Sequence, residues 1–577
     1  MPTTASAPHA RTTVVRPSDP TLQPALRLAL AFASIKLLLH IAANLWQAHI
    51  GWGYFRDEFY YIACGRHLAW GYVDHGPLVA LQSRLAETLF GHSLAGLRLL
   101  SAAAGAARIL LTGLLAWSLG GRRPAQALAM IAVLVAPQYL GTDGYLSMNS
   151  FESLFWMSCL LALILAQRRL APESTAGVHH PSQPHRDGWD VIGQQSGTPI
   201  VAWSRSALRT PWILFGLSAG LGLLNKPSMT FFLLALGAAL LLTPARRLLF
   251  NRHAALGIAI LVLIASPNLL WQMHNGWPTL EFLRNGRAEG KNISLAPPAF
   301  LLAQVNALHP LNILVWIPGL YALLFGALAK RWRWLGLTYL LFITGMMLLH
   351  AKDYYCTPIY PILFAAGGIA WENRFARTRA VGQNRTFAFP ILESALLLSG
   401  LLILPMAIPV LRPETWLTYT KAMHLYGKSG NTETFASGPL PQFFADRFGW
   451  QEEVNQVLAA YRSLPPSDRQ RVCIFTSNYG EAGAIDFLGP PAQPGLPPAL
   501  SGQNTYWLWG THGCDPNLVI AVIRDTREQL LTKYQDVDLV GRMSNPLSMP
   551  FEHRGIYLLR NRRPTAPFKW KDERFYF

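Results

Sequence analysis

The chain has 577 residues, of which 51% are hydrophobic and only 14% are charged. The hydrophobic residues gather in blocks of about twenty, the length of helix that crosses the roughly 30 Å hydrocarbon core of a bilayer. This pattern excludes a soluble globular protein and predicts a polytopic α-helical membrane protein. The net charge of +18 does not indicate nucleic-acid binding, because the Lys and Arg residues fall in short loops between the hydrophobic blocks.

The hydrophobic blocks predict about eleven membrane-spanning helices, within a range of about ten to thirteen. In chain order they cover residues 24–46, 94–119, 125–139, 151–166, 211–224, 228–242, 254–271, 298–328, 335–350, 356–371 and 392–410. We therefore expect one transmembrane domain over residues 24–411. Residues 1–23 begin with a stretch rich in Ser, Thr, Pro and Ala, and we expect a disordered cytoplasmic tail there.

Basic residues orient the predicted spans. If the spans alternate, one side of the membrane receives the basic loops, which contain Arg122 and Arg123, Arg168 and Arg169, Arg246, Arg247 and Arg252, Lys330, Arg331 and Arg333, and residues 374–385. The positive-inside rule makes this side cytoplasmic, together with the N-terminus and the polar loop 171–209. The first external loop, residues 52–93, and the C-terminal region then lie on the opposite side.

Residues 412–577 have a different character from the hydrophobic spans. Short apolar runs at 471–475, 518–523 and 555–559 predict strands, and residues 450–461 predict a helix. We expect a soluble extracytoplasmic α/β domain. Cys473 and Cys514 both fall in this domain, where a disulfide is permitted, but their spacing does not decide whether they pair.

An acidic pair, Asp57 and Glu58, directly follows the first predicted span. The aromatic residues after it suit interfacial helices in the external loop. Two neighbouring carboxylates that are partly withdrawn from water cannot both ionise cheaply, so one of them is a candidate proton acceptor. The alternative is an acidic helix cap, because carboxylates are favoured near a helix N-terminus. The sequence physics leaves both interpretations open.

Other polar residues are predicted on the same side of the membrane. Asn149 and Glu152 are three residues apart and share a helix face, with Asp143 close before them. An ionisable group at the edge of a span, such as Glu152, is costly and indicates function. Lys226 and Lys352 each interrupt an apolar run, which suits either lysines that reach the headgroups or lysines that bind a phosphate.

Several motifs occur in a fixed order: Asp57-Glu58-x-Tyr60-Tyr61, Gly71-Tyr72-x-Asp74, Pro77-Leu78, Leu224-Asn225-Lys226-Pro227 and Lys352-x-Tyr354-Tyr355-x-x-Pro358-x-Tyr360-Pro361. In this order the chain resembles glycosyltransferase family 39, which includes bacterial relatives of the dolichyl-phosphate-mannose protein mannosyltransferases and of the aminoarabinose lipid A transferase. The resemblance covers residues 25–410. It implies a GT-C type membrane fold and a polyprenyl-phosphate sugar donor. It also implies a lipid, glycan or protein acceptor on the outer side of the bacterial inner membrane.

The resemblance also implies roles for individual residues. Asp57, with Glu58 beside it, takes the proton of the acceptor while the acceptor oxygen attacks the anomeric carbon opposite the phosphate, so the configuration inverts. The donor phosphate is assigned to Lys226, Lys352 and Arg56. The acceptor or the sugar is assigned to Tyr60, Tyr61, Asp74, Asp143, Asn149, Glu152, Tyr354 and Tyr355.

Two departures from the family pattern limit these expectations. The turn reads Asp74-His75-Gly76-Pro77-Leu78 in place of Asp-x-Pro-Pro-Leu, and Asn149 stands where many members carry an acid. The second departure puts a metal site in doubt, so no cofactor is assigned and a divalent metal stays open. The alternative function is a transporter or flippase for a lipid-linked or anionic solute, which predicts polar residues deep within the spans and an internal repeat. Neither is evident in the sequence.

Overall fold

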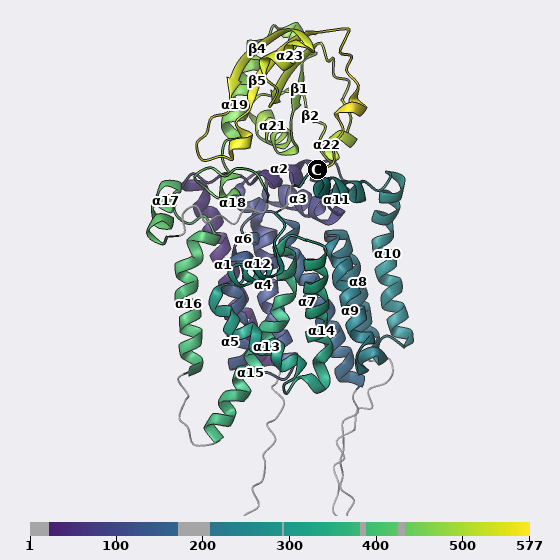
Figure 1. The fold of residues 1–577 in the computed structure, drawn as a ribbon, viewed down its shortest axis with the longest axis vertical. Helices are drawn as coiled ribbons and strands as arrows, with labels where there is room; N and C mark the ends of the chain where they lie inside the picture. The colour runs from purple at the N-terminus through teal and green to yellow at the C-terminus, as the bar shows by residue number, and fades with distance from the viewer. Residues whose placement is uncertain (1–21, 171–207, 291–292, 381–387, 425–432) are drawn as a thin grey trace, which may run out of the picture.

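The computed structural model describes residues 22–170, 208–290, 293–380, 388–424 and 433–577. Nearly all of the predicted tail 1–23 and of the predicted loop 171–209 lies outside these residues. Within them, helices form one long bundle, and a small sheet domain built from the C-terminal part of the chain sits at one end of it (Figure 1). This agrees with the predicted helical membrane protein and its C-terminal α/β domain.

Among the described residues, five helices are long and apolar enough to cross a membrane. They are α1 (Leu22–His49), α4 (Leu94–Ser118), α7 (Met148–Leu170), α10 (Arg252–His274) and α16 (Ala388–Ala407). The bundle also contains α5 (Arg123–Leu134), α6 (Pro137–Thr142), α8 (Arg209–Asn225), α9 (Ser228–Leu241), α14 (Ala329–Leu348) and α15 (Tyr360–Ala380). The exact number of spans stays a prediction.

The predicted span 298–328 is wrong as a single helix. It is divided into α12 (Pro297–Ala307) and α13 (Ile313–Leu324), and the two directions differ by 104°. The break falls at Pro310, which follows His309 with a backbone φ of 79°. Proline cannot donate its backbone N–H and disfavours a helical conformation in the residue before it. The same effect separates α5 from α6, where Pro137 begins the second helix.

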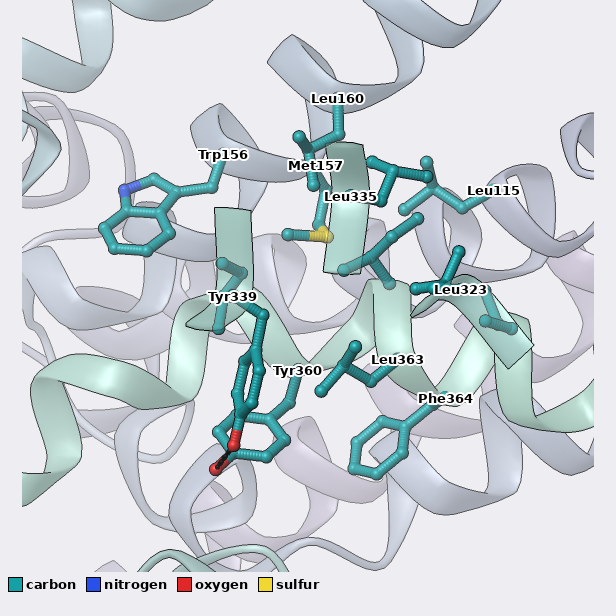
Figure 2. Packing of buried hydrophobic residues seen from close by; sticks show 14 of the residues in the cluster. Leu115, Trp156, Met157, Leu160, Leu323, Leu335, Tyr339, Tyr360, Leu363 and Phe364 are labelled. Atoms are coloured by element: carbon teal, nitrogen blue, oxygen red, sulfur yellow. Dashed lines mark hydrogen bonds between the residues drawn. The ribbon is translucent and has the colours of Figure 1, made fainter. Parts of the chain in front are cut away.

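The core of the bundle is apolar and closely packed. Figure 2 shows part of this core, in which the hydroxyl groups of Tyr339 and Tyr360 form a hydrogen bond of 3.0 Å with each other. Glycines allow α13 and α15 to approach each other: a Cβ on Gly319 would lie 2.1 Å from the carbonyl oxygen of Leu363. Small residues at such contacts are typical of packing between membrane helices.

The C-terminal domain is a five-stranded mixed sheet with strand order β2-β1-β3-β5-β4. The strands are β1 (Cys473–Thr476), β2 (Ala499–Ser501), β3 (Leu518–Ile523), β4 (Tyr534–Arg542) and β5 (Gly555–Arg562). β1 runs parallel to both β2 and β3, whereas β5 is antiparallel to β3 and β4. The sequence predicted β1, β3, β5 and the helix α19 (Trp450–Ser463). It missed β2, which has three residues, and β4, which lies at the sheet edge and is rich in polar residues.

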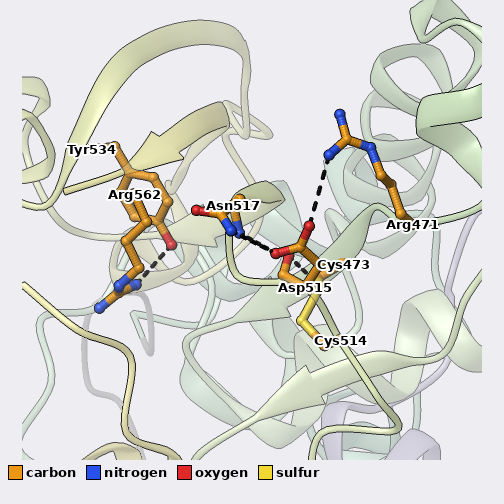
Figure 3. The surroundings of a disulfide bond; sticks show 7 residues. All are labelled: Arg471, Cys473, Cys514, Asp515, Asn517, Tyr534 and Arg562. Carbon is orange, nitrogen blue, oxygen red and sulfur yellow. Dashed lines mark hydrogen bonds and ion pairs between the residues drawn. A yellow bond between two sulfur atoms is a disulfide. The ribbon is translucent and has the colours of Figure 1, made fainter. Parts of the chain in front are cut away.

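The structure pairs Cys473 with Cys514, with 5.5 Å between their Cα atoms. The disulfide joins β1 to the loop before β3, and Arg471 and Asp515 lie next to it (Figure 3). The spacing of the two cysteines did not decide whether they pair. They come together because β1 and β3 are neighbouring parallel strands, which brings the start of β1 next to the loop before β3.

The C-terminal domain packs tightly on the interfacial helices predicted for the first external loop, α2 (Arg56–Arg66) and α3 (Pro77–Phe90) (Figure 1). Its helix α21 (Tyr479–Ala492) contacts α2 through two glycines. A Cβ on Gly480 would lie 2.5 Å from Cγ of Arg56, and one on Gly483 would lie 2.8 Å from Cβ of Phe59. Buried residues of α2, α19 and α21 belong to one hydrophobic cluster. The acidic pair is therefore on a helix that the C-terminal domain covers.

Several buried acidic residues of this domain lie around one arginine, Arg554. Arg554 donates a hydrogen bond to Glu481 at 2.7 Å, and Glu552 lies 3.8 Å away. The buried Glu453 carboxylate accepts no hydrogen bond from any residue that the structure describes. Burial and the charge of Glu481 raise the pKa of Glu453, and burial, opposed by Arg554, raises the pKa of Glu481 to about 8.

These raised pKa values predict a domain that is less stable at alkaline pH. The folded domain keeps protons that the unfolded chain loses above pH 4.5, so the free energy of unfolding falls as the pH rises toward about 8. Glu453→Gln cannot ionise and is expected to raise the free energy of unfolding at pH 8 by at least about 1 kcal/mol, with little change at pH 5. Urea unfolding of the full chain in detergent, followed by Trp fluorescence, measures this. The exposed Glu528→Gln is the control, and an unchanged pH dependence in Glu453→Gln would contradict the assignment.

Candidate functional site

Asp57 is the accessible carboxylate of the acidic pair. It lies in the first turn of α2, and 29% of its side chain is exposed. Its Oδ1 accepts a hydrogen bond of 3.0 Å from the hydroxyl of Tyr479, the first residue of α21 in the C-terminal domain. Its Oδ2 accepts no hydrogen bond from the described part of the chain. One oxygen is therefore held in place and the other is available to a substrate.

Glu58, which was predicted to support catalysis, is a buried structural residue. Its carboxylate accepts two hydrogen bonds from Arg98, at 2.8 and 2.7 Å, and backbone N–H groups of Phe55 and Leu146 donate two more at 2.8 Å. Burial alone would raise its pKa, but the Arg98 guanidinium holds the pKa below its ordinary value. The helix-cap interpretation fits Glu58, whose carboxylate accepts a hydrogen bond from the backbone N–H of Phe55, while Asp57 also lies in the first turn of α2 but is partly exposed.

A second group of charges lies beside Asp57. The Arg56 guanidinium is 3.6 Å from Asp57, 3.8 Å from Glu433 and 3.9 Å from Asp446. Lys352 reaches the same Glu433 at 3.8 Å, so two of the predicted phosphate ligands share one counter-ion. Burial raises the pKa of Asp446 to about 7 against the opposing effect of Arg56. Glu433 and Asp446 gave no sequence signal, because both are ordinary polar residues of the C-terminal region.

The third predicted phosphate ligand, Lys226, lies among the predicted residues of two other segments. Its ammonium group donates hydrogen bonds to Asn149 at 2.7 Å and to Glu152 at 3.0 Å. It also lies 4.2 Å from the ring centroid of Tyr355 and 5.2 Å from that of Tyr354. Sequence reasoning placed these five residues on one side of the membrane, and the structure brings them together.

A tyrosine connects this group with Asp57. Tyr145 interacts electrostatically with Asp57 and also interacts with Asn149, and Tyr354 interacts electrostatically with Tyr145 and Tyr61. Tyr145 therefore lies near both Asp57 and the Lys226 group. Tyr145 was not predicted, and its place in the turn before Asn149 was the available signal.

Asp74, in the loop before α3, is connected to the C-terminal domain through Tyr60 of α2. The Tyr60 hydroxyl lies 2.7 Å from both Asp74 Oδ1 and Thr505 Oγ1. Burial raises the pKa of Asp74. Gly76, which replaces proline of the family pattern, contacts the Lys226 segment closely: a Cβ there would lie 2.1 Å from the carbonyl oxygen of Leu224. The departure thus allows a close backbone contact between two parts of the site.

The prediction that Asp143 binds the acceptor or the sugar is wrong. Its side chain is 0% exposed and pairs with Lys36 of α1 at 3.1 Å and with Arg108 of α4 at 3.0 Å. A ligand cannot reach it, so the three residues form a structural charge cluster between helices. Lys36 and Arg108 were missed, although an ionisable residue within a hydrophobic span is itself the signal for such a cluster.

The described residues contain no group of three or more His, Cys, Asp or Glu side chains that could hold a metal ion. The sequence assigned no cofactor and left a divalent metal open, and this finding does not change that. The arrangement supplies one accessible carboxylate next to two cationic groups, at the end of the bundle that the C-terminal domain covers. Such a set can accept a proton and bind an anionic leaving group.

Comparisons with known proteins agree with this arrangement. Residues 200–271 match the family model described as dolichyl-phosphate-mannose-protein mannosyltransferase. The structure of ArnT from Cupriavidus metallidurans bound to undecaprenyl phosphate is similar to the chain, with a TM-score of 0.51, 15% identity, and coverage of 95% of this chain and 100% of that one. The same protein in the apo state gives a TM-score of 0.50 and 14% identity over 91% and 98% of the two chains.

No curated protein matches the chain significantly by sequence. At 15% identity, the likeness to ArnT shows a shared fold over the whole length of that chain. The family-model match lies in the segment that contains Leu224-Asn225-Lys226-Pro227, one of the motifs of the resemblance. The chain therefore has the fold of ArnT and contains a segment similar to the dolichyl-phosphate-mannose-protein mannosyltransferase family model.

Proposed function

We propose that the chain moves a sugar from a polyprenyl-phosphate donor to a lipid, glycan or protein acceptor, with inversion at the anomeric carbon. The observation that carries this proposal is the exposure of Asp57 and the contacts around it. It is exposed on one side, is held on the other by Tyr479, and lies 3.6 Å from Arg56 in the group that contains Lys352. The related ArnT structure is bound to undecaprenyl phosphate, which supports a lipid phosphate as the carrier.

In this reaction Asp57 accepts the acceptor's proton while the acceptor oxygen attacks from the face opposite the phosphate. The phosphate leaves as an anion and needs cations more than it needs a proton. Lys352 and Arg56 on one side and Lys226 on the other would hold it. The tyrosines between them, Tyr61 and Tyr354, would contact the sugar.

The transporter alternative has less support. A translocation path needs polar groups that water or solute can reach. The charges within the helices, Lys36, Arg108 and Asp143, are 0% exposed and pair with one another. They therefore hold helices together and line no path.

We also propose that the site faces the non-cytoplasmic side of a bacterial inner membrane, with the N-terminus in the cytoplasm. The basic loops between the spans support this orientation. The disulfide between Cys473 and Cys514 supports an oxidising compartment for the C-terminal domain.

The test is transfer by the purified full chain in liposomes. Undecaprenyl-phosphate sugars with a radiolabelled sugar are supplied together with an envelope extract, and the label in extract components is measured. We expect transfer with at least one sugar. Movement of the intact labelled lipid between leaflets, without transfer from any sugar donor, would support the transporter instead.

Tyr479→Phe tests the contribution of the C-terminal domain to the site. The hydroxyl of Tyr479 holds Oδ1 of Asp57 at 3.0 Å, so its loss is expected to leave the carboxylate less well oriented toward the acceptor. We expect kcat to fall about 10-fold while KM changes little. Tyr461→Phe, which loses a 3.3 Å hydrogen bond elsewhere in the same domain, is the control. An unchanged kcat in Tyr479→Phe would contradict the positioning role.

A further inference from the structure

A cavity of about 250 Å³ lies where the C-terminal domain meets α2. Its wall includes Asn478 and Tyr479, which follow β1, Gln503, which follows β2, and Arg524, which follows β3. These are the carboxyl ends of the three parallel strands, and β1 stands between the other two. Ligands in open α/β sheets bind at such a point, where neighbouring connections leave in opposite directions.

The lining of the cavity is cationic and aromatic. Three arginines line it, Arg56, Arg524 and Arg554, and no acidic side chain of the described residues does. Phe435, Phe551 and Phe575 provide apolar surface. Such a lining suits an anionic group attached to a larger molecule, because guanidinium groups bind oxyanions through paired N–H donors.

Arg524 keeps donors free for a ligand, whereas Arg56 makes long ion pairs, of 3.6 to 3.9 Å, with Asp57, Glu433 and Asp446. Arg554 is neutralised by Glu481 and Glu552. The Arg56 side chain is nine-tenths buried yet donates no hydrogen bond to any described residue, since its nearest carboxylates are 3.6 Å or more away. Arg524 has no ion pair within the described ranges and donates one hydrogen bond, of 3.3 Å, to the carbonyl oxygen of Phe551.

The guanidinium groups of Arg56 and Arg524 lie near the same aromatic ring, that of Phe551. The ring of Phe551 lies 5.7 Å from Cζ of Arg56 and 5.6 Å from Cζ of Arg524. Burial and the nearby charge of Arg554 lower the pKa of Arg524, against the opposing charges of Glu552 and Glu481, so an anion next to Arg524 would stabilise its charged form.

The cavity is also next to the proposed base. Tyr479 lines the cavity and donates its hydroxyl hydrogen bond to Asp57 at 3.0 Å. Arg56, which we assign to the donor phosphate, lies at the edge next to α2, and all the other lining residues belong to the C-terminal region. A donor lipid held among the membrane helices would not occupy this cavity, whereas an acceptor that arrives from the aqueous side would.

We propose that this cavity binds an oxyanion of the acceptor, a phosphate or a carboxylate, and so presents the acceptor's nucleophile to Asp57. The assignment rests on the proposed transferase function, because it requires a carrier lipid on the other side of Asp57. The acceptor is therefore an anionic molecule, and Arg524 is a residue that determines acceptor specificity.

Binding of the anion is tested with the full chain in detergent, saturated with undecaprenyl phosphate so that the donor site is occupied. Inorganic phosphate and acetate are titrated separately against chloride at equal ionic strength, and the apparent Tm is followed. We expect at least one of the two anions to raise the Tm with a saturable concentration dependence. Arg524→Gln is expected to weaken this binding at least 10-fold, and Arg524→Lys to weaken it less.

Arg542→Gln is the matched control, because Arg542 is an exposed arginine of β4 in the same domain and lines no part of the cavity. Equal anion binding by wild type and Arg524→Gln, or no anion binding by wild type, would overturn the proposal. The change in Tm when undecaprenyl phosphate is added alone, before the anions, measures binding at the donor site separately. If it fails to raise the Tm of the wild type, the proposed function fails, whereas an anion response that is insensitive to Arg524 defeats the cavity assignment alone.

Discussion

Asp57→Asn is expected to lower kcat for sugar transfer by about 10²- to 10⁴-fold, the usual contribution of a general base. Asparagine keeps the size of the side chain and can still accept the hydrogen bond from Tyr479, but it cannot take a proton. Since Asp57 is partly exposed and has no ion pair shorter than 3.6 Å, the protein should fold normally. Transfer of radiolabelled sugar from its polyprenyl-phosphate donor, at saturating donor, measures the change.

The control for this prediction is Asp538→Asn, which makes the same substitution at an exposed position of β4, where 61% of the side chain is accessible. It is expected to leave transfer unchanged. Full activity in Asp57→Asn, with the Tm of the wild type, would show that another group accepts the proton.

Asp143→Asn is expected to destabilise the folded bundle by about 3–5 kcal/mol, the cost of breaking a buried ion pair by removing one partner. It leaves Lys36 and Arg108 without their shared counter-ion at positions that are 0% exposed. The site is tightly constrained, since even a Cβ on Gly105 would lie 2.3 Å from the Asp143 carboxylate. The apparent Tm in detergent and the yield of monodisperse protein measure the loss.

A double variant separates charge balance from a catalytic role. Lys36→Met combined with Asp143→Asn removes one cation together with the anion, so it should be more stable than Asp143→Asn alone. If Asp143→Asn kept the wild-type Tm but lost transferase activity, Asp143 would belong to the active site after all.

The sequence was sufficient to predict a helical membrane protein and to propose Asp57 as a base, since both depend on local pattern. Block length predicts membrane helices, and a carboxylate directly after a span, next to interfacial aromatics, indicates chemistry. It was also sufficient for the group around Lys226, because Asn149 and Glu152 share a helix face and all the motifs are expected on one side of the membrane. Proline at residues 137 and 310 signalled the breaks in two predicted spans, although the blocks looked continuous.

Glu58 shows what local pattern could not decide. Asp57 and Glu58 are equivalent in composition, yet one is exposed and the other accepts four hydrogen bonds. The difference depends on Arg98, which is 40 residues away, and on the direction in which each side chain leaves α2. The same holds for Tyr479, which is 422 residues from Asp57 and lies beside it only because α21 packs on α2.

The sequence by itself therefore determined the class of protein and pointed to Asp57 as the proposed base. These follow from segment length and from side chains that are close along the chain. The tertiary structure alone decided which acids are neutralised, which cations share a counter-ion, and that the C-terminal domain packs on the helix that carries Asp57. Those features arise from contacts between segments tens to hundreds of residues apart, and the free energy of burying a charge depends on which partner the fold brings to it.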